Sequence, residues 1–270
     1  MQAELFVRNG RGMMLTGAGQ VLLARTEGLV RQIEQVRDDL QSAAGTPSGR
    51  VALGMVPTVS NVISARFARR VAMELPRVSL RIVESYGGHL VEWLHRNELD
   101  LAIIYGPGTD LHLSVQTIGR DDIVAVGPPG SGLGGQQEVG MSWLLEQRLI
   151  LPSYSHGLRA LIERAAARQK RSLEIVMEAD SYRMLTSLVE EGLGYTVLPP
   201  SAIRLETQAG RLETAIIAPP GITRELILAA PLNIPPSIAT TAISAVILTE
   251  IARLADEGTW AIRQAVQATA

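Results

Sequence analysis

The stretch Val51-Ala52-Leu53-Gly54-Met55-Val56-Pro57-Thr58-Val59-Ser60-Asn61 passes from an apolar run directly into residues with helical spacing. Residues 51–56 have the composition of a short buried strand, and residues 59–74 carry apolar side chains at helical intervals as far as Leu75-Pro76. The alternation continues with a strand at 80–82, a helix at 89–96 and a buried strand at 99–104. Strands that alternate with helices predict βαβ crossovers and a mostly parallel sheet covered on both faces.

A second unit of the same kind follows a glycine- and proline-rich break at residues 127–135, which reads as a flexible loop. Its predicted elements are a strand at 149–151, a helix at 157–168, a strand at 173–177, a helix at 182–191, a strand at 195–198, extended runs at 214–217 and 226–229, and a helix at 237–254. Two α/β units joined by crossovers are typical of the two-lobed fold of periplasmic binding proteins, which closes on a ligand between its lobes. We therefore expect a ligand-binding domain over residues 51–270, with lobe I at about 51–125 plus 226–270 and lobe II at about 126–225.

The N-terminal residues 1–15 predict a small β-hairpin. Asn9-Gly10 supplies two residues that accept positive φ, so Phe6-Val7 and Met13-Met14-Leu15 can pair across a tight turn edged by Arg8 and Arg11. Thr16 can cap the helix that follows. The two arginines are candidates for contacts with DNA phosphates or the minor groove, and the alternative is a solvated hairpin tip.

A long helix is predicted over residues 16–42, followed by a hinge of small and turn-forming residues at 43–50. One seam of this helix has alternating spacings of four and three, formed by Leu22, Thr26, Leu29, Ile33, Val36 and Leu40. The residues around the seam are polar and leave little else to cover it, which favours a dimer seam. The alternative is a face packed on its own domain.

Composition limits the function classes. The chain of 270 residues is 46% hydrophobic, and 25 Lys+Arg against 27 Asp+Glu give a net charge of −2, so any contact with DNA must be local. The absence of cysteine excludes disulfides and thiolate chemistry. The N-terminus carries Glu4 and lacks the pattern of a signal peptide, which predicts a cytoplasmic protein. Residues 238–252 are apolar but interrupted by polar residues, which predicts a packed helix and no membrane partner.

Candidate binding residues lie where strands turn into helices. Thr58, Ser60 and Asn61 follow the first strand, and Ser153 and His156 lie in the equivalent turn of the second unit. The free N–H groups of helix N-termini attract anions, so two facing turns predict a cleft for a small carboxylate or similar anion. For Thr58 or Ser60 alone, plain helix capping is the more common role.

An ordered set of short signatures resembles the LysR-type transcriptional regulators. The signatures are Pro47-Ser48-Gly49-Arg50, Pro57-Thr58-Val59-Ser60, Leu75-Pro76, Gly87-Gly88-His89-Leu90, Leu99-Asp100-Leu101-Ala102 and Glu191-Gly192-Leu193-Gly194-Tyr195-Thr196-Val197-Leu198-Pro199, together with the hairpin, which resembles the family's wing. The stretches 88–94 and 151–159 are most similar to the nitrogen-assimilation-control branch.

The resemblance implies a type II-like periplasmic-binding-protein sensor behind a β-hairpin wing and a linker helix that dimerises. It implies effector contacts at Thr58, Ser60, Asn61 and Ser153, with Tyr105 as a wall and Gly194-Tyr195 as backbone near the cleft. Arg8, Asn9 and Arg11 become candidate DNA contacts. In the family three helices precede the wing, whereas only Met1-Gln2-Ala3-Glu4 precede it here. We expect either that Met1 is an internal start or that most of the DNA reader is missing.

Other kinds of site lack their sequence patterns. Gly192 and Gly194 are not followed by Gly-Lys-Ser/Thr, so a turn is favoured over a phosphate cradle. The four histidines fit no metal spacing, and His156 near Ser153 lacks a Gly-x-Ser-x-Gly elbow. The sequence therefore predicts no enzyme, no metal and no cofactor.

The leading hypothesis is a DNA-binding regulator whose small, anionic effector controls the geometry of a homodimer or homotetramer on promoter DNA. The second hypothesis is an effector-binding and oligomerisation module without specific DNA binding. A solute-binding protein ranks third, because the chain shows the seam helix and no signal peptide.

Overall fold

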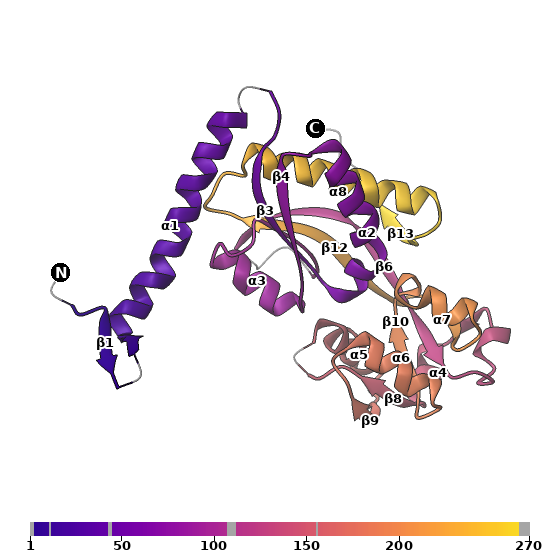
Figure 1. The fold of residues 1–270 in the computed structure, drawn as a ribbon. Helices are drawn as coiled ribbons and strands as arrows, with labels where there is room; N and C mark the ends of the chain where they lie inside the picture. The colour runs from indigo at the N-terminus through magenta and orange to yellow at the C-terminus, as the bar shows by residue number, and fades with distance from the viewer. Residues whose placement is uncertain (1–2, 11, 43–44, 107–111, 155, 265–270) are drawn as a thin grey trace.

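The computed structural model describes residues 3–10, 12–42, 45–106, 112–154 and 156–264 (Figure 1). At its N-terminal end, β1 (Phe6–Asn9) and β2 (Gly12–Leu15) pair antiparallel, with Phe6 opposite Leu15. This is the hairpin that the Asn9-Gly10 turn predicts. Thr16 Oγ1 accepts the N–H of Gly19 at 3.0 Å and so caps the following helix, α1 (Gly17–Ser42). Arg11 lies outside the described residues.

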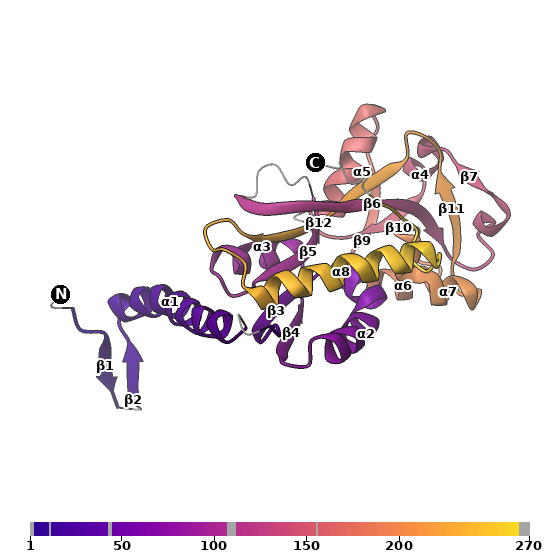
Figure 2. The same cartoon turned by 90° about the horizontal axis from the view of Figure 1, so that it is seen from above.

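The linker helix α1 projects from the body of the molecule and holds the hairpin away from both lobes (Figures 1 and 2). Its C-terminal half docks on lobe I through polar side chains. Asp39 Oδ1 accepts the N–H of Ile238 at 2.9 Å, Gln35 Nε2 donates to the carbonyl of Pro235 at 3.3 Å, and Ser42 Oγ accepts the N–H of Ser48 at 2.9 Å. The face of α1 that contacts the lobe is therefore polar.

Lobe I is built on three parallel strands in the order β4-β3-β5. The chain passes through β3 (Gly49–Met55), α2 (Pro57–Glu74), β4 (Val78–Glu84), α3 (Gly87–His95) and β5 (Leu101–Tyr105). The pattern of apolar strands and amphipathic helices in the sequence predicts each of these elements. The helix α8 (Ile238–Asp256) packs beside α2 on one face of the sheet, and α3 covers the other face (Figure 1).

The apolar helix α8 is long enough and hydropathic enough to cross a membrane by those two criteria alone. In the structure, one side of it is buried in the core of lobe I, with Ile243, Ile247 and Ile251 all at most 1% exposed. The hydropathy of α8 is therefore explained by packing, as expected for residues 238–252.

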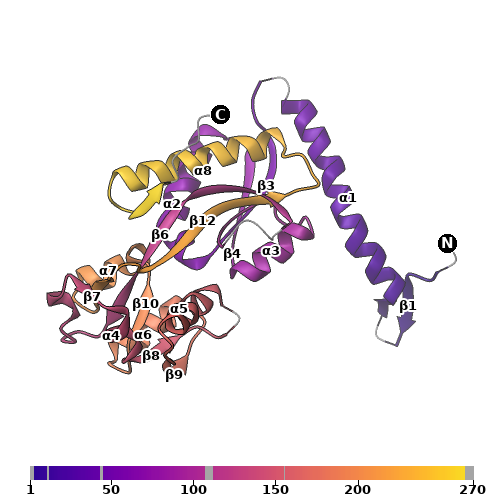
Figure 3. The same ribbon diagram turned by 180° about the vertical axis from the view of Figure 1, so that it is seen from behind.

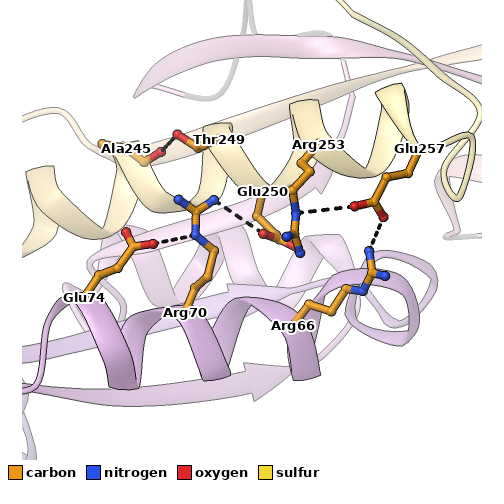
Figure 4. A network of polar contacts seen from close by, with 8 residues as sticks. All are labelled: Arg66, Arg70, Glu74, Ala245, Thr249, Glu250, Arg253 and Glu257. Atoms are coloured by element: carbon orange, nitrogen blue, oxygen red, sulfur yellow. Dashed lines mark hydrogen bonds and ion pairs between the residues drawn. The ribbon is translucent and has the colours of Figure 1, made fainter.

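A polar network fixes α8 to α2 above the core (Figure 4). Glu250 is fully buried, and its carboxylate lies 3.0 Å from Arg253 Nη2 and 3.5 Å from Arg70 Nη1. Arg66 of α2 pairs with Glu257 just beyond α8. Because a buried charge is stable only when it is paired, these contacts fix the register between the two helices.

The expectation of a mostly parallel sheet does not extend to the strands that connect the two lobes. β12 (Ile222–Pro231) runs antiparallel to β5, and β6 (Leu113–Gly127) runs antiparallel to β12. The 15-residue strand β6 is not among the predicted elements, because the polar run Arg120-Asp121-Asp122 divides its apolar residues into two short stretches. A short strand, β13 (Ile262–Gln264), pairs with the middle of β6.

Lobe II surrounds the far end of β6. Its elements are η2 (Leu133–Gly135), β7 (Glu138–Val139), α4 (Met141–Leu145), β8 (Arg148–Leu151), α5 (Gly157–Arg168), β9 (Glu174–Glu178), α6 (Tyr182–Glu190), β10 (Thr196–Leu198), η3 (Pro200–Ile203), α7 (Arg204–Gln208) and β11 (Glu213–Ile217). β10 and β11 pair antiparallel with β6, and β8 pairs in parallel with β9.

The glycine-rich loop at 127–135 wraps around one carboxylate. Glu213 accepts the N–H groups of Gly130 at 2.8 Å and Gly134 at 3.1 Å, and the hydroxyl of Ser131 at 2.9 Å. These hydrogen bonds lower the pKa of Glu213. The loop is thus hydrogen-bonded to Glu213 of β11. The sequence predicts a flexible loop and does not predict these hydrogen bonds.

The two lobes have separate hydrophobic cores that meet on β6 and β12. Along β6, Ile118 belongs to the core of lobe I and Ile123 to the core of lobe II, and along β12 the change falls between Leu226 and Ile222. These two antiparallel strands are the connection between the lobes that is visible from behind in Figure 3. Residues at the changeover, including Asp121 and Arg224, therefore lie where the lobes meet.

Candidate functional site: an anion-binding cleft between the lobes

A cavity of about 220 Å³ lies between the lobes, beside the strands that connect them. Lobe I contributes the turn from β3 into α2, the N-terminus of α3 and the end of β5. Lobe II contributes the turn from β8 into α5 and the turn from β9 into α6. The residues that line this effector cleft include Thr58, Tyr86, Gly87, Gly88, Tyr105, Pro152, His156, Leu158, Asp180, Tyr182, Leu185, Leu198 and Arg224.

Arg224 supplies the positive charge of the cleft. It lies on β12 directly opposite Asp121 of β6, and its Nη2 donates to Asp121 Oδ2 at 3.1 Å. The guanidinium carbon stacks 3.4 Å from the ring centroid of Tyr105, whose hydroxyl donates to the same Asp121 oxygen at 2.8 Å. Burial raises the pKa of Tyr105, so its hydroxyl stays a donor.

Contacts with Asp121 and Tyr105 fix the position of the Arg224 guanidinium, but they do not use all of its N–H donors. Its side chain is only 7% exposed, and its Nε has no hydrogen-bond partner within the described residues. A buried donor without a partner costs free energy, which an anion in the cleft would recover. Arg224 is thus an arginine fixed in place by Asp121 and Tyr105 with donor capacity left over.

Four helices begin at the cleft: α2, α3, α5 and α6. Among the residues that the structure describes, no side chain caps the N-terminus of α2, α3 or α6. Free N–H groups and the positive end of the helix dipole favour an anion at each of these termini. Gly87 and Gly88 open α3, and a Cβ at either position would meet no atom within 4 Å, so they leave the entrance to these N–H groups clear.

His156 caps the fourth helix. Its Nδ1 accepts the N–H of Leu158 at 3.2 Å, and its ring lies edge-on to Tyr86 of lobe I with the centroids 5.9 Å apart. Burial lowers the pKa of His156, and the nearby Arg224 lowers it further, while Asp180 acts in the opposite direction. The imidazole is therefore neutral at pH 7 in the unliganded protein.

Asp180 lies on the exposed rim of the cleft. Its Oδ1 accepts the backbone N–H of Ser153 at 2.9 Å, and hydrogen bonds from Ser153 lower the pKa of this carboxylate. The contact joins the turn after β8 to the turn before α6. Ser153 thus supports the wall of the cleft, and it is not among the lining residues.

The residues expected at the binding site divide into two groups. Thr58, Tyr105 and His156 line the cleft together. Ser60 is half-buried on α2 beyond the cleft lining, and Asn61 lines a different cavity on the next part of that helix. Gly194 and Tyr195 lie in lobe II, where Tyr195 bonds to the backbone of β8 and its ring packs against Trp143 at 5.5 Å.

Sequence reasoning missed Arg224, Asp121, Tyr86 and Asp180. Arg224 and Asp121 are 103 positions apart and meet only through the register of β6 and β12. The signals that could have found them are charged residues inside strand-like runs, namely Asp121-Asp122 and Arg224 beside an apolar segment. A charge within a buried strand is rare without a partner or a role.

The residues expected to bind DNA and to dimerise lie at the N-terminal end. Arg8 and Asn9 are exposed on the hairpin. Leu22, Ile33, Val36 and Leu40 are exposed along α1, with Ile33 72% and Leu40 73% accessible, and Thr26 is half-buried. The side chain of Leu29 lies outside the described part of the chain.

Two α/β lobes, joined by antiparallel strands and with a cleft between them, define a ligand-binding domain of the type II periplasmic-binding-protein kind. A family model described as the LysR substrate binding domain matches residues 44–251. The chain belongs to this family of LysR-type transcriptional regulators.

Curated relatives are regulators of transcription and not enzymes. The nitrogen assimilation regulatory protein nac of Klebsiella aerogenes is 30% identical over 232 residues, which cover 84% of this chain and 74% of that protein. The HTH-type transcriptional regulator BbuR of Bordetella bronchiseptica is 29% identical over 224 residues, covering 83% of this chain and 69% of that protein. The expected similarity to the nitrogen-assimilation branch is confirmed.

Solved structures show the same fold. The OxyR C206 mutant of Corynebacterium glutamicum superposes with a TM-score of 0.70 at 24% identity, covering 97% of this chain and 84% of that one. The effector binding domain of QuiR in complex with shikimate gives a TM-score of 0.67 at 17% identity, covering 75% of this chain and 96% of that domain. The present sequence contains no cysteine, so thiol chemistry is not available to it.

Proposed function

We propose that this chain senses a small anion in the effector cleft and controls the geometry of a LysR-type oligomer on promoter DNA. The proposal rests on Arg224, which lies among four helix N-termini and whose Nε has no hydrogen-bond partner within the described residues. The curated relatives are regulators of transcription, which supports a location in the cytoplasm, where the promoter DNA lies.

The cleft favours a compact carboxylate with an apolar body. Arg224 and the uncapped helices offer donors for one anionic group. Pro152, Leu158, Leu185 and Leu198 offer apolar surface for the remainder. A ligand that contacts both lobes stabilises the arrangement in which these groups come together, and this is the physical basis of a ligand-driven shift between two states.

The apolar seam of α1 supports dimerisation. The helix docks on its own lobe through Gln35, Asp39 and Ser42, whereas Ile33, Val36 and Leu40 remain exposed. The alternative of a seam packed on its own domain is therefore disfavoured. A second copy of α1 would remove this apolar surface from water.

Specific DNA binding requires more than the hairpin. Arg8 and Asn9 could contact phosphates or the minor groove beside a recognition helix, but two such contacts supply little affinity by themselves. A module that binds effector and oligomerises without reading DNA is the second candidate function. A gel-retardation assay at low salt, with this chain and its own promoter region, separates the two candidate functions. The DNA-binding regulator predicts a shifted band, and the module that does not read DNA predicts none.

A thermal-shift and calorimetric panel of acetate, benzoate, shikimate, succinate and citrate tests the cleft. We expect at least one of these carboxylates to raise the melting temperature of the protein. Arg224→Gln should weaken that binding by roughly tenfold or more, because a hydrogen bond to a charged group contributes about 1.5–3 kcal/mol. Arg164→Gln, at an exposed position on α5, is the matched control and should leave binding unchanged. Equal binding by wild type and Arg224→Gln would place the effector elsewhere.

A further inference from the structure

A second cavity between the lobes, which we call the lateral groove, lies next to the effector cleft and has a volume of about 450 Å³. Its walls come from α2 of lobe I and from α6, η3 and α7 of lobe II. Tyr182, the first residue of α6, lines both the lateral groove and the effector cleft. The two cavities therefore share one side chain and both span the boundary between the lobes.

The lateral groove contains arginines that carboxylates do not neutralise. Arg204 of α7 makes neither a hydrogen bond nor an ion pair with any described residue. Arg183 of α6 donates only to the hydroxyl of Tyr182, at 3.3 Å, and no described carboxylate lies within ion-pair distance of it. A third arginine, Arg211, is shared between Glu190 at 3.5 Å and Glu206 at 3.7 Å. The two acidic residues of the lining are thus engaged by Arg211.

Lobe I contributes a neutral donor to the same groove. The carboxamide of Asn61 is exposed on α2 and has no hydrogen-bond partner within the described part of the chain. Two guanidinium groups and one amide, carried by three different helices, thus line one cavity. The lining is mostly polar or charged, whereas the effector cleft is walled by proline, leucine and tyrosine.

We propose that the lateral groove is a second ligand site, which binds a small phosphate-bearing anion between Arg183, Arg204 and Asn61. A tetrahedral phosphate presents acceptor oxygens in several directions, which suits donors that approach from three elements. Such an anion joins α2 of lobe I to α6 and α7 of lobe II. Because Tyr182 lines both sites, the anion is coupled to the effector through the position of α6.

Titration calorimetry of the full chain with sodium pyrophosphate, at constant ionic strength, tests the second site. Wild type is expected to bind, and Arg183→Gln and Arg204→Gln are each expected to weaken binding roughly tenfold, the loss that corresponds to about 1.4 kcal/mol. Arg164→Gln, an exposed arginine of α5 outside the groove, should bind pyrophosphate like wild type. Arg224→Gln should also bind it normally, which separates this site from the effector cleft.

Several results would overturn the second site. Absence of binding at millimolar pyrophosphate would do so, as would equal weakening by Arg164→Gln, which indicates attraction to charge alone. Loss of binding in Arg224→Gln with retention in Arg183→Gln and Arg204→Gln would move the anion into the effector cleft. Tighter binding of malonate than of pyrophosphate would contradict the choice of phosphate. Circular dichroism of each variant shows that the fold is retained.

Discussion

Arg224 is the charged side chain on which the effector cleft depends. Asp121 and Tyr105 fix its position, and both come from strands next to β12. The three residues stabilise one another, because Arg224 compensates the buried charge of Asp121 and Tyr105 donates to the same oxygen. Burial nevertheless raises the pKa of Asp121. This cluster lies at the changeover between the two cores, so it connects ligand recognition with the relative position of the lobes.

His156 makes the stability of the protein depend on pH. Because burial lowers its pKa, the unfolded chain takes up a proton more readily than the folded chain as the pH falls. The folded state is therefore expected to lose stability as the pH falls through about 6.5, the value for an unperturbed histidine. His156→Asn keeps a side-chain acceptor for the Leu158 N–H and removes the titration.

Melting temperatures measured from about pH 7.5 to about pH 5.5 check this expectation. The wild type should lose more stability than His156→Asn over this range. An identical loss in the two proteins would show that other groups cause the pH dependence.

At the scale of elements, α1 has two faces with different roles. Polar residues hold its C-terminal half on lobe I, and Asp39 accepts the first backbone N–H of α8 while Ser237 accepts the N–H of Thr240. The seam residues Ile33, Val36 and Leu40 are exposed to solvent. Under the proposed dimerisation, the same helix connects lobe I with the interface between the subunits.

Ile33→Asp combined with Leu40→Asp is predicted to convert the proposed α1-mediated dimer into monomers. Each substitution removes an apolar side chain whose burial contributes about 1.5–3 kcal/mol, and it places a charge in the seam. Analytical ultracentrifugation measures the outcome. Ile216→Asp, at a similarly exposed isoleucine on β11, is the matched control and should remain dimeric. A dimer that persists in the double variant would rule out the α1 seam as the main interface.

The loop at 127–135 depends on Glu213. The two carboxylate oxygens of Glu213 together accept two backbone N–H groups and a hydroxyl, and Glu213→Gln removes the negative charge and replaces one of these oxygens with an NH2 group. Limited proteolysis should therefore cleave this loop faster in Glu213→Gln than in wild type. Glu138→Gln, at an exposed position on β7, is the control. Equal cleavage rates in wild type and Glu213→Gln would show that the carboxylate does not hold the loop.

At the scale of the whole molecule, the sequence predicts the local elements better than their assembly. The hairpin, α1 and the alternation from β3 to β5 follow from turn residues and apolar periodicity. The strand β6 was missed because Arg120-Asp121-Asp122 interrupts it, and of these residues Asp121 is buried and pairs with Arg224 where the two cores meet. The sequence around this polar run does not show which core each flanking stretch joins. It therefore could not identify the run as the boundary between the two cores.

The same limit applies to the site. Thr58 and His156 could be predicted because each lies where a strand gives way to a helix: Thr58 is in the first turn of α2, and His156 caps α5. Asn61 lies three residues beyond Thr58, and the helix carries it into the lateral groove. Arg224 reaches the cleft only through the pairing of β12 with β6, which no short-range pattern contains.

We propose that an anion held by Arg224 changes the relative position of the lobes. Because the sequence has no cysteine, the double variant Met73→Cys on α2 and Arg168→Cys on α5 carries one spin label on each lobe. Pulsed electron paramagnetic resonance then measures the distance between the two labels. A saturating concentration of the carboxylate that binds best in the panel is predicted to shift and narrow the distance distribution, and Arg224→Gln is predicted to abolish the change. A distance distribution that stays unchanged at saturating carboxylate would show that the anion does not change the relative position of the lobes.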